Sequence, residues 1–171
     1  MLMIYAGRHI SGGHYNSAIT VSIYLRGIFD KNDILPYIIV QLIAAVSAAL
    51  VVMRFSLSGD ASSEILTLGI EAIIAEFIFT FTLAYVVLHV ATTESTLDNN
   101  YYGAAIALVV LVGAMTVGSI SLASFNPAVS SALIFSGKIS LADSWIHFAP
   151  QFIGAVLATY LYRYSHRSTI Q

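Results

Sequence analysis

Four long apolar stretches constrain this chain more than any other feature of its sequence. They run over residues 34–53, 68–91, 101–121 and 144–162. Each has about 20 residues, the length of an α-helix that crosses the hydrocarbon core of a bilayer. Hydrophobic residues make up 58% of the 171 and charged residues only 9%, whereas a soluble domain carries roughly 25% charged residues. The sequence therefore predicts an all-α integral membrane protein.

The same composition excludes several classes of function. Lys and Arg number 7 against 9 Asp and Glu, so no basic stripe is available to follow a nucleic-acid backbone. The chain has no cysteine, which excludes disulfides, thiol catalysis and zinc–thiolate sites. No constellation of residues indicates an enzyme, a metal site or a cofactor site. The partner that the composition requires is a lipid bilayer.

Two further segments, residues 9–27 and 121–137, are moderately apolar, but the continuous apolar run in each is too short to span a bilayer. In each, small residues lead to an Asn, a small residue and an Ala, and then to an apolar run of about 10 residues. Such a run suits a re-entrant half-helix, whose irregular backbone must be buried in protein or line a water-filled cavity. The two triplets are Asn16-Ser17-Ala18 and Asn126-Pro127-Ala128.

The repeated triplets indicate an inverted repeat with interrupted helices, an arrangement found in channels and transporters. An asparagine at a helix N-terminus caps free backbone N–H groups. Two half-helices that meet near the midplane direct their positive ends at one spot, which disfavours cations and protons. The amide groups of Asn16 and Asn126 can donate hydrogen bonds to a passing solute. The alternative is that each asparagine only caps its helix.

Basic residues near the span ends predict the orientation. If the four spans alternate in direction across the membrane, five basic residues fall on one side of it. The other two, Arg54 and Lys138, fall on the opposite side. The excess of positive charge places both termini in the cytoplasm. The five are Arg8, Arg26, Lys31, Arg163 and Arg167.

Two segments resemble the paired Asn-Pro-Ala loops of the major intrinsic protein family, the aquaporins and aquaglyceroporins. They are GRHISGGHYNSAITV (7–21) and SISLASFNPAVSSAL (119–133). PYIIVQLIAAVSAAL (36–50), IAEFIFTFTLAYVV (74–87) and IGAVLATYLYR (153–163) resemble the third, fourth and sixth helices of the family. The resemblance covers essentially the whole chain as one domain, residues 1–171. It implies an aquaporin-like fold of four full spans and two half-helices, assembled as a homotetramer in the plasma membrane.

The resemblance implies a passive channel for water or small neutral solutes. Ser17 replaces the first proline, and we expect a slightly looser loop. Val129 replaces the arginine that usually follows the second triplet, and alignment puts Ala114 and Ala123 beside it in the outer filter. These three residues predict a wide, apolar filter that admits glycerol, urea, ammonia or hydrogen peroxide. A filter that has decayed without selection is the alternative.

Three further residues are expected to support the re-entrant loops. Gln41 and Glu76 match a glutamine and a buried glutamate of the family, and His14 stands two residues before the first Asn. Only the apolar residues 1–7 precede the first loop, where the family has two complete spans. The fold is therefore expected to be incomplete at its N-terminus, through a truncated gene, a misassigned start or a partial sequence. A non-conducting, degenerate family member or a modulatory membrane subunit is the alternative function.

Overall fold

The structure is a computed structural model that describes residues 1–56 and 65–166, all of whose regular elements are helices. The predicted loop at residues 58–64 and Arg167 lie outside the described residues. Four helices are long and three α-helices have ten residues or fewer. The long helices are α3 (Lys31–Ser56), α4 (Ile70–Thr92), α5 (Tyr102–Ser121) and α7 (Trp145–Ser165). The short ones are α1 (Leu2–Ser11), α2 (Ser17–Arg26) and α6 (Pro127–Phe135), with 3₁₀ turns at Glu94–Thr96 and Leu141–Asp143.

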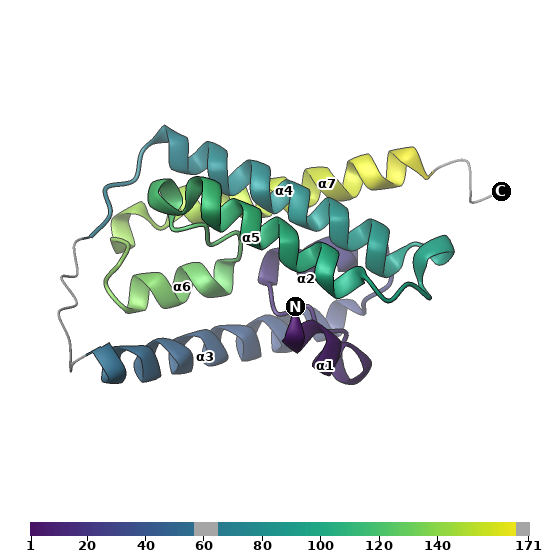
Figure 1. Cartoon of the computed structure of the whole chain (residues 1–171), viewed down its shortest axis with the longest axis horizontal. Helices are drawn as coiled ribbons and strands as arrows, with labels where there is room; N and C mark the ends of the chain where they lie inside the picture. The colour runs from purple at the N-terminus through teal and green to yellow at the C-terminus, as the bar shows by residue number, and fades with distance from the viewer. Residues whose placement is uncertain (57–64, 167–171) are drawn as a thin grey trace.

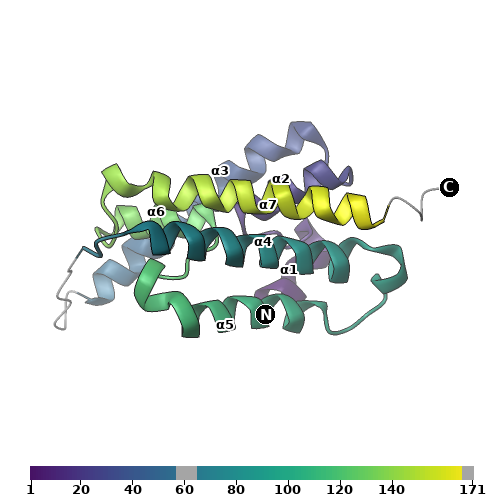
Figure 2. The ribbon, with the colours of Figure 1, turned by 90° about the horizontal axis from the view of Figure 1, so that it is seen from above.

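The long helices lie roughly along one direction, and the short helices α2 and α6 fill the space between them (Figure 1). Seen from above, α4 lies between α7 and α5 (Figure 2). Helix α4 packs so closely on α7 that a Cβ atom added to Gly154 would come within 2.7 Å of the Phe77 carbonyl oxygen. Helix α3 runs along the opposite side and packs against α6 and α2. This arrangement buries the first turns of α2 and α6 inside the bundle.

The predicted half-helices are present because the sequence starts and stops them sharply. Asn16 and Asn126 have extended backbones and cap the N-termini of α2 and α6. Pro127 occupies the first position of α6, where its missing N–H is harmless. Gly27 ends α2 in the left-handed conformation, with φ of 92°. The resulting helices have 10 and 9 residues and cannot cross a bilayer.

The four predicted spans correspond to the four long helices, with ends that differ by a few residues. Among the described residues, three helices are both long and apolar enough to cross a membrane: α3, α4 and α5. Helix α7 has 21 residues and the required length. It falls short on apolarity because its first half carries the polar residues His147 and Gln151, which are fully buried against protein. The buried face of α7 therefore combines these polar side chains with apolar ones such as Ile146, Ala155 and Ala158.

The first re-entrant segment begins later than the predicted residue 9. Helix α1 continues through His9 and Ile10 to Ser11, and Gly12 ends it with φ of 81°. The irregular part of the first loop is therefore residues 12–16, and α2 follows immediately. The second loop is similarly short, because α5 ends at Ser121 and α6 begins at Pro127.

Three basic residues gather at one end of the bundle. Arg8 donates to the carbonyl of Ala91 at 3.3 Å and lies over the Tyr102 ring. At the same end Arg26 lies over the ring of Tyr162, and Arg163 donates to the carbonyl of Leu25 at 3.4 Å. These contacts lie where α2, α4 and α7 end, so the cations face the negative poles of three helix dipoles. The predicted grouping of these three residues agrees with the fold.

Candidate functional site

The N-termini of α2 and α6 meet at the centre of the bundle and are joined by two reciprocal hydrogen bonds. The side-chain amide of Asn16 donates to the carbonyl of Phe125 at 2.8 Å. The side-chain amide of Asn126 donates to the carbonyl of Tyr15 at 2.8 Å. Each asparagine thus binds the residue that precedes the other asparagine. The two loops form a symmetric clasp, although 110 positions separate the asparagines in sequence (126 − 16 = 110).

Both asparagines also cap their helices. The side-chain oxygen of Asn16 accepts from the backbone N–H groups of Ala18 and Ile19, at 3.0 and 3.3 Å. That of Asn126 accepts from the N–H of Ala128 at 3.0 Å. A side-chain amide has two N–H donors, and the clasp uses one from each asparagine. One N–H of each remains able to donate to another acceptor.

The clasp requires an uncommon backbone conformation before each asparagine. Tyr15 has φ of 27° and Phe125 has φ of 47°, in the left-handed region that non-glycine residues rarely adopt. This conformation directs their carbonyl groups across to the opposite loop. Such residues cost on the order of 1–3 kcal/mol each and persist where the surroundings hold them in place.

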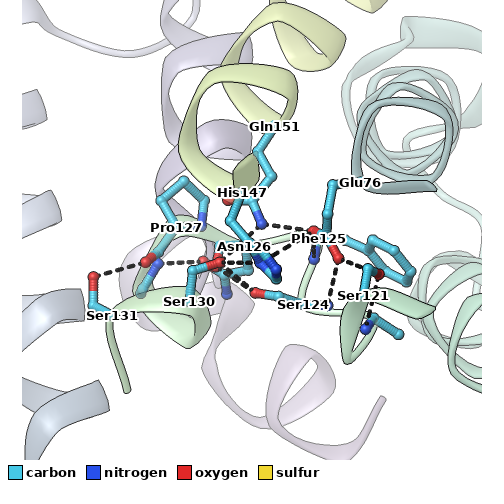
Figure 3. A network of polar contacts seen from close by, with 12 residues as sticks. Glu76, Ser121, Ser124, Phe125, Asn126, Pro127, Ser130, Ser131, His147 and Gln151 are labelled. Carbon is cyan, nitrogen blue, oxygen red and sulfur yellow. Dashed lines mark hydrogen bonds and ion pairs between the residues drawn. The ribbon is translucent and has the colours of Figure 1, made fainter. Parts of the chain in front are cut away.

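Glu76 holds the second loop from the side of α4 (Figure 3). Its carboxylate is fully buried and accepts four hydrogen bonds. One oxygen accepts from the Ser121 hydroxyl at 2.7 Å and from the backbone N–H of Ser124 at 3.0 Å. The other accepts from the backbone N–H of Phe125 and from the Gln151 amide, both at 2.7 Å. The carboxylate therefore satisfies two backbone donors of the loop, the N–H groups of Ser124 and Phe125.

Helix α7 supports the same loop through two polar side chains one turn apart. The Gln151 amide donates to the Ser130 hydroxyl at 2.9 Å, and Nδ1 of His147 lies 3.1 Å from that hydroxyl. Ser130 in turn lies 2.7 Å from the hydroxyl of Ser124, which donates to the carbonyl of Asn126. The network in Figure 3 thus runs from α7 to the asparagine itself.

The first loop is supported from α3 in a comparable way. The Gln41 amide donates to the Thr20 hydroxyl at 3.0 Å and accepts from the Ser17 hydroxyl at 2.7 Å. One turn earlier, the Tyr37 hydroxyl accepts from the backbone N–H of His14 at 3.2 Å and donates to the carbonyl of Ser11 at 2.9 Å. Tyr37 was not expected to take part in the site.

His14 supports the first loop by packing rather than by a side-chain hydrogen bond. Its ring lies 5.1 Å from the rings of both Phe29 and Tyr37, measured between centroids. Among the described residues, its buried Nδ1 atom has no hydrogen-bond partner. The hydrogen bond that His14 makes to α3 comes from its backbone N–H, which donates to the Tyr37 hydroxyl.

A cavity of about 400 Å³ opens beside the clasp. Asn16, Asn126 and Ser124 of the two loops line it, together with Arg8 and with Ile, Leu and Val side chains of α1, α2, α4 and α5. Val129 lines the cavity and is 41% exposed. Ala114 and Ala123 do not line it: Ala114 is exposed on α5, and Ala123 packs against the core. The structure thus brings one of the three predicted filter residues to this cavity.

The sequence contains an internal repeat that could have identified Gln151 as the counterpart of Gln41. QLIAAVSAAL (41–50) in α3 and QFIGAVLATY (151–160) in α7 share their leading Gln and the Ile, Ala and Val that follow at equivalent positions. Tyr37 and His147 each precede the glutamine by four residues, so they lie on the same helix face as it does.

In the described part of the chain, no group of three His, Cys, Asp or Glu side chains could hold a metal ion.

Comparisons with known proteins agree with this geometry. The model of the family described as major intrinsic protein matches residues 1–162. The chain is 31% identical over 168 residues to Aquaporin NIP1-4 of Oryza sativa subsp. japonica, a match that covers 95% of the chain and 60% of the relative. It is 30% identical over 181 residues to Aquaporin Z of Photorhabdus laumondii, covering 95% and 77%. It is also 30% identical over 174 residues to Aquaporin NIP1-2 of Arabidopsis thaliana, covering 95% and 58%. The chain therefore spans about three fifths of the length of the two plant relatives.

Proposed function

The chain belongs to the major intrinsic protein family, and from that premise we propose that it forms a passive membrane channel for water or small neutral solutes. The clasp between the two half-helices carries this proposal. It places the positive ends of α2 and α6 together beside an apolar cavity that both asparagines line. A cation at this point faces two helix N-termini, whereas a neutral solute oxygen can accept the remaining amide N–H of each asparagine.

The wall of the cavity supports a broad choice of neutral solutes. Val129, next to the second triplet, offers an uncharged and half-exposed side chain where a charged donor would narrow the path. We propose that Val129 contributes to the filter and that glycerol, urea, ammonia and hydrogen peroxide pass together with water. Ala114 and Ala123 complete the proposed filter by resemblance to the family.

Orientation and assembly are part of the same proposal. Arg8, Arg26 and Arg163 gather at one end of the bundle, and clustered cations mark the cytoplasmic side of membrane proteins. We therefore propose that both termini lie in the cytoplasm, that the protein resides in the plasma membrane, and that protomers assemble as a homotetramer.

The proposal is tested by stopped-flow light scattering of liposomes that contain the purified chain. We expect water permeability above that of empty liposomes, and faster glycerol and urea uptake. The variant Val129→Arg should lower glycerol and urea uptake more than water permeability, because the guanidinium narrows the path and adds charge. Val129→Met is the matched control, since its side chain is long but uncharged.

Two results would contradict parts of the proposal. Equal glycerol flux in Val129→Arg and the parent protein would remove Val129 from the filter. Water permeability equal to that of empty liposomes in a correctly folded sample would favour the second function, a non-conducting family member or modulatory subunit.

A further inference from the structure

The two halves of the protein support their asparagines through equivalent glutamines. Gln41 donates to the hydroxyl of Thr20, and Gln151 donates to the hydroxyl of Ser130. Thr20 and Ser130 each lie four residues after a clasp asparagine. Each hydroxyl is linked by hydrogen bonds to the backbone carbonyl of that asparagine, either directly or through one further hydroxyl. The Thr20 hydroxyl donates to the Asn16 carbonyl directly, at 3.1 Å.

The halves differ at the carbonyl oxygen of the glutamine. Oε1 of Gln41 accepts the hydroxyl of Ser17 at 2.7 Å. Oε1 of Gln151 is buried and has no partner among the described residues. The residue that follows each asparagine differs in parallel: Ser17 has a hydroxyl to donate, whereas Pro127 has none. The serine in the first triplet therefore satisfies a buried acceptor that stays unsatisfied in the second half.

The direction of the hydrogen bonds around Gln41 is fixed by its neighbours. The Thr20 hydroxyl donates to the Asn16 carbonyl, so it must accept from the glutamine N–H₂ group. The glutamine oxygen therefore faces Ser17. The four residues Asn16, Ser17, Thr20 and Gln41 form a closed ring of covalent and hydrogen bonds, and each is at most 8% exposed.

We infer that the Ser17 hydroxyl positions Asn16 through Gln41 and Thr20, and is a required part of the first loop rather than a tolerated substitute for proline. Proline would preset the first helical φ angle but could not hold Gln41. In this chain the hydrogen bond from Ser17 to Gln41 of α3 replaces that constraint. Ser17, Thr20 and Gln41 are positioning residues, since only Asn16 among the four lines the cavity. The inference rests on the proposed function in one respect, that the Asn16 amide faces the permeating solute.

The test reads the Asn16 side chain directly by NMR of protein labelled with ¹⁵N at asparagine. The chain has five asparagines, at 16, 32, 99, 100 and 126, so each side-chain amide signal can be assigned by substitution. In Ser17→Ala we expect the Asn16 amide signals to shift more than those of the other four. Ser17→Pro should produce the same shift, because it also removes the hydroxyl, and it preserves the helical start if the alanine variant folds poorly.

Matched variants separate the Gln41 ring from a general loss of structure. Ser131→Ala removes a hydroxyl from α6 that, among the residues the structure describes, bonds within its own helix, at 2.9 Å to the Pro127 carbonyl, and it should leave the Asn16 signals in place. Gln41→Met should shift them, and adding Ser17→Ala to it should cause no further shift. An unchanged Asn16 signal in both Ser17→Ala and Ser17→Pro overturns the inference, as does an equal shift in Ser131→Ala.

A flux measurement on the same variants separates this inference from the channel proposal. If the protein conducts, water permeability should fall in Ser17→Ala and Ser17→Pro but not in Ser131→Ala. Permeability unchanged by both Ser17 variants overturns the positioning role. If no variant and no parent sample conducts, the channel proposal fails, and the Asn16 signals still decide whether Ser17 positions that side chain.

Discussion

Glu76 gives the sharpest prediction about what holds the site together. Its buried carboxylate accepts from Ser121, Ser124, Phe125 and Gln151. Two of these donors can adapt if the acceptor is lost, because a hydroxyl can rotate and an amide can flip. The backbone N–H groups of Ser124 and Phe125 cannot turn away, since the loop conformation fixes them. The stability lost on substitution of Glu76 therefore depends on whether both, one or neither of these N–H groups keeps a hydrogen bond.

The two N–H groups give the expected magnitude. A buried donor without a partner costs about 1–3 kcal/mol, so Glu76→Leu, which abandons both, should lose about 2–6 kcal/mol of unfolding free energy. Glu76→Gln keeps one carbonyl oxygen and strands one backbone donor, so it should lose about 1–3 kcal/mol. Gln151 can absorb part of the change, because its unpaired Oε1 can accept from the new amide. The loss expected for Glu76→Leu is comparable with the whole unfolding free energy of a marginally stable domain, about 5 kcal/mol.

The assay is equilibrium unfolding in mixed micelles, with SDS as denaturant and helical circular dichroism as the signal. Glu71→Gln is the control, because Glu71 lies on the same helix but is exposed. We expect the order parent, Glu71→Gln, Glu76→Gln and Glu76→Leu, with the first two equal. A leucine variant as stable as the parent, or a glutamine variant as unstable as the leucine one, would contradict the role given to the two backbone N–H groups.

Two further predictions concern packing and the first loop. Gly154→Ala should destabilise the protein by about 1–3 kcal/mol, as overpacking does, because its Cβ would meet the backbone of α4. Gly118→Ala, whose Cβ would meet nothing within 4 Å, should be neutral or stabilising in the same unfolding assay. Tyr37→Phe should cost about 1 kcal/mol, because it removes the hydroxyl that accepts from His14. Tyr24→Phe, at a tyrosine that is 36% exposed on α2, is its control, and an equal loss in both would contradict the role of Tyr37.

The sequence predicted the half-helices because their signals are local. An asparagine cap, a proline at the first helical position of α6 and a glycine after α2 define both ends within ten residues. The family resemblance also pointed to Gln41 and Glu76 as supports. The Glu76 side chain contacts the second loop, and the Gln41 side chain contacts the first turn of α2 directly after the first loop. Predictions that depend on one turn of backbone or one motif match could therefore be made without a structure.

The residues that could not be predicted are those whose role depends on which way a long helix faces. In a nearly all-apolar helix the hydrophobic periodicity is weak, so it gives no sign of which neighbours Tyr37 and His147 contact. For Gln151 the sequence signal is instead the repeat shared by residues 41–50 and 151–160. The first re-entrant segment was expected from residue 9, but His9, Ile10 and Ser11 are compatible with a helix and α1 continues through them until Gly12 ends it. For Ser17 the sequence indicated a looser loop, and nothing in it revealed the hydrogen bond to Gln41.

The two halves solve one physical problem with different chemistry. Each loop must turn a carbonyl toward the opposite asparagine, which leaves backbone N–H groups facing away from any helix. In the second half a buried carboxylate collects them, and Pro127 fixes the start of α6. In the first half a neutral hydroxyl, that of Tyr37, accepts one N–H, and Ser17 holds α2 through Gln41. Because hydrogen bonds to a carboxylate are about twice as strong as those between neutral groups, the second loop is the more strongly held side of the clasp. The first loop depends on Ser17 and Tyr37, and the geometry of Asn16 is therefore the more sensitive of the two to single substitutions.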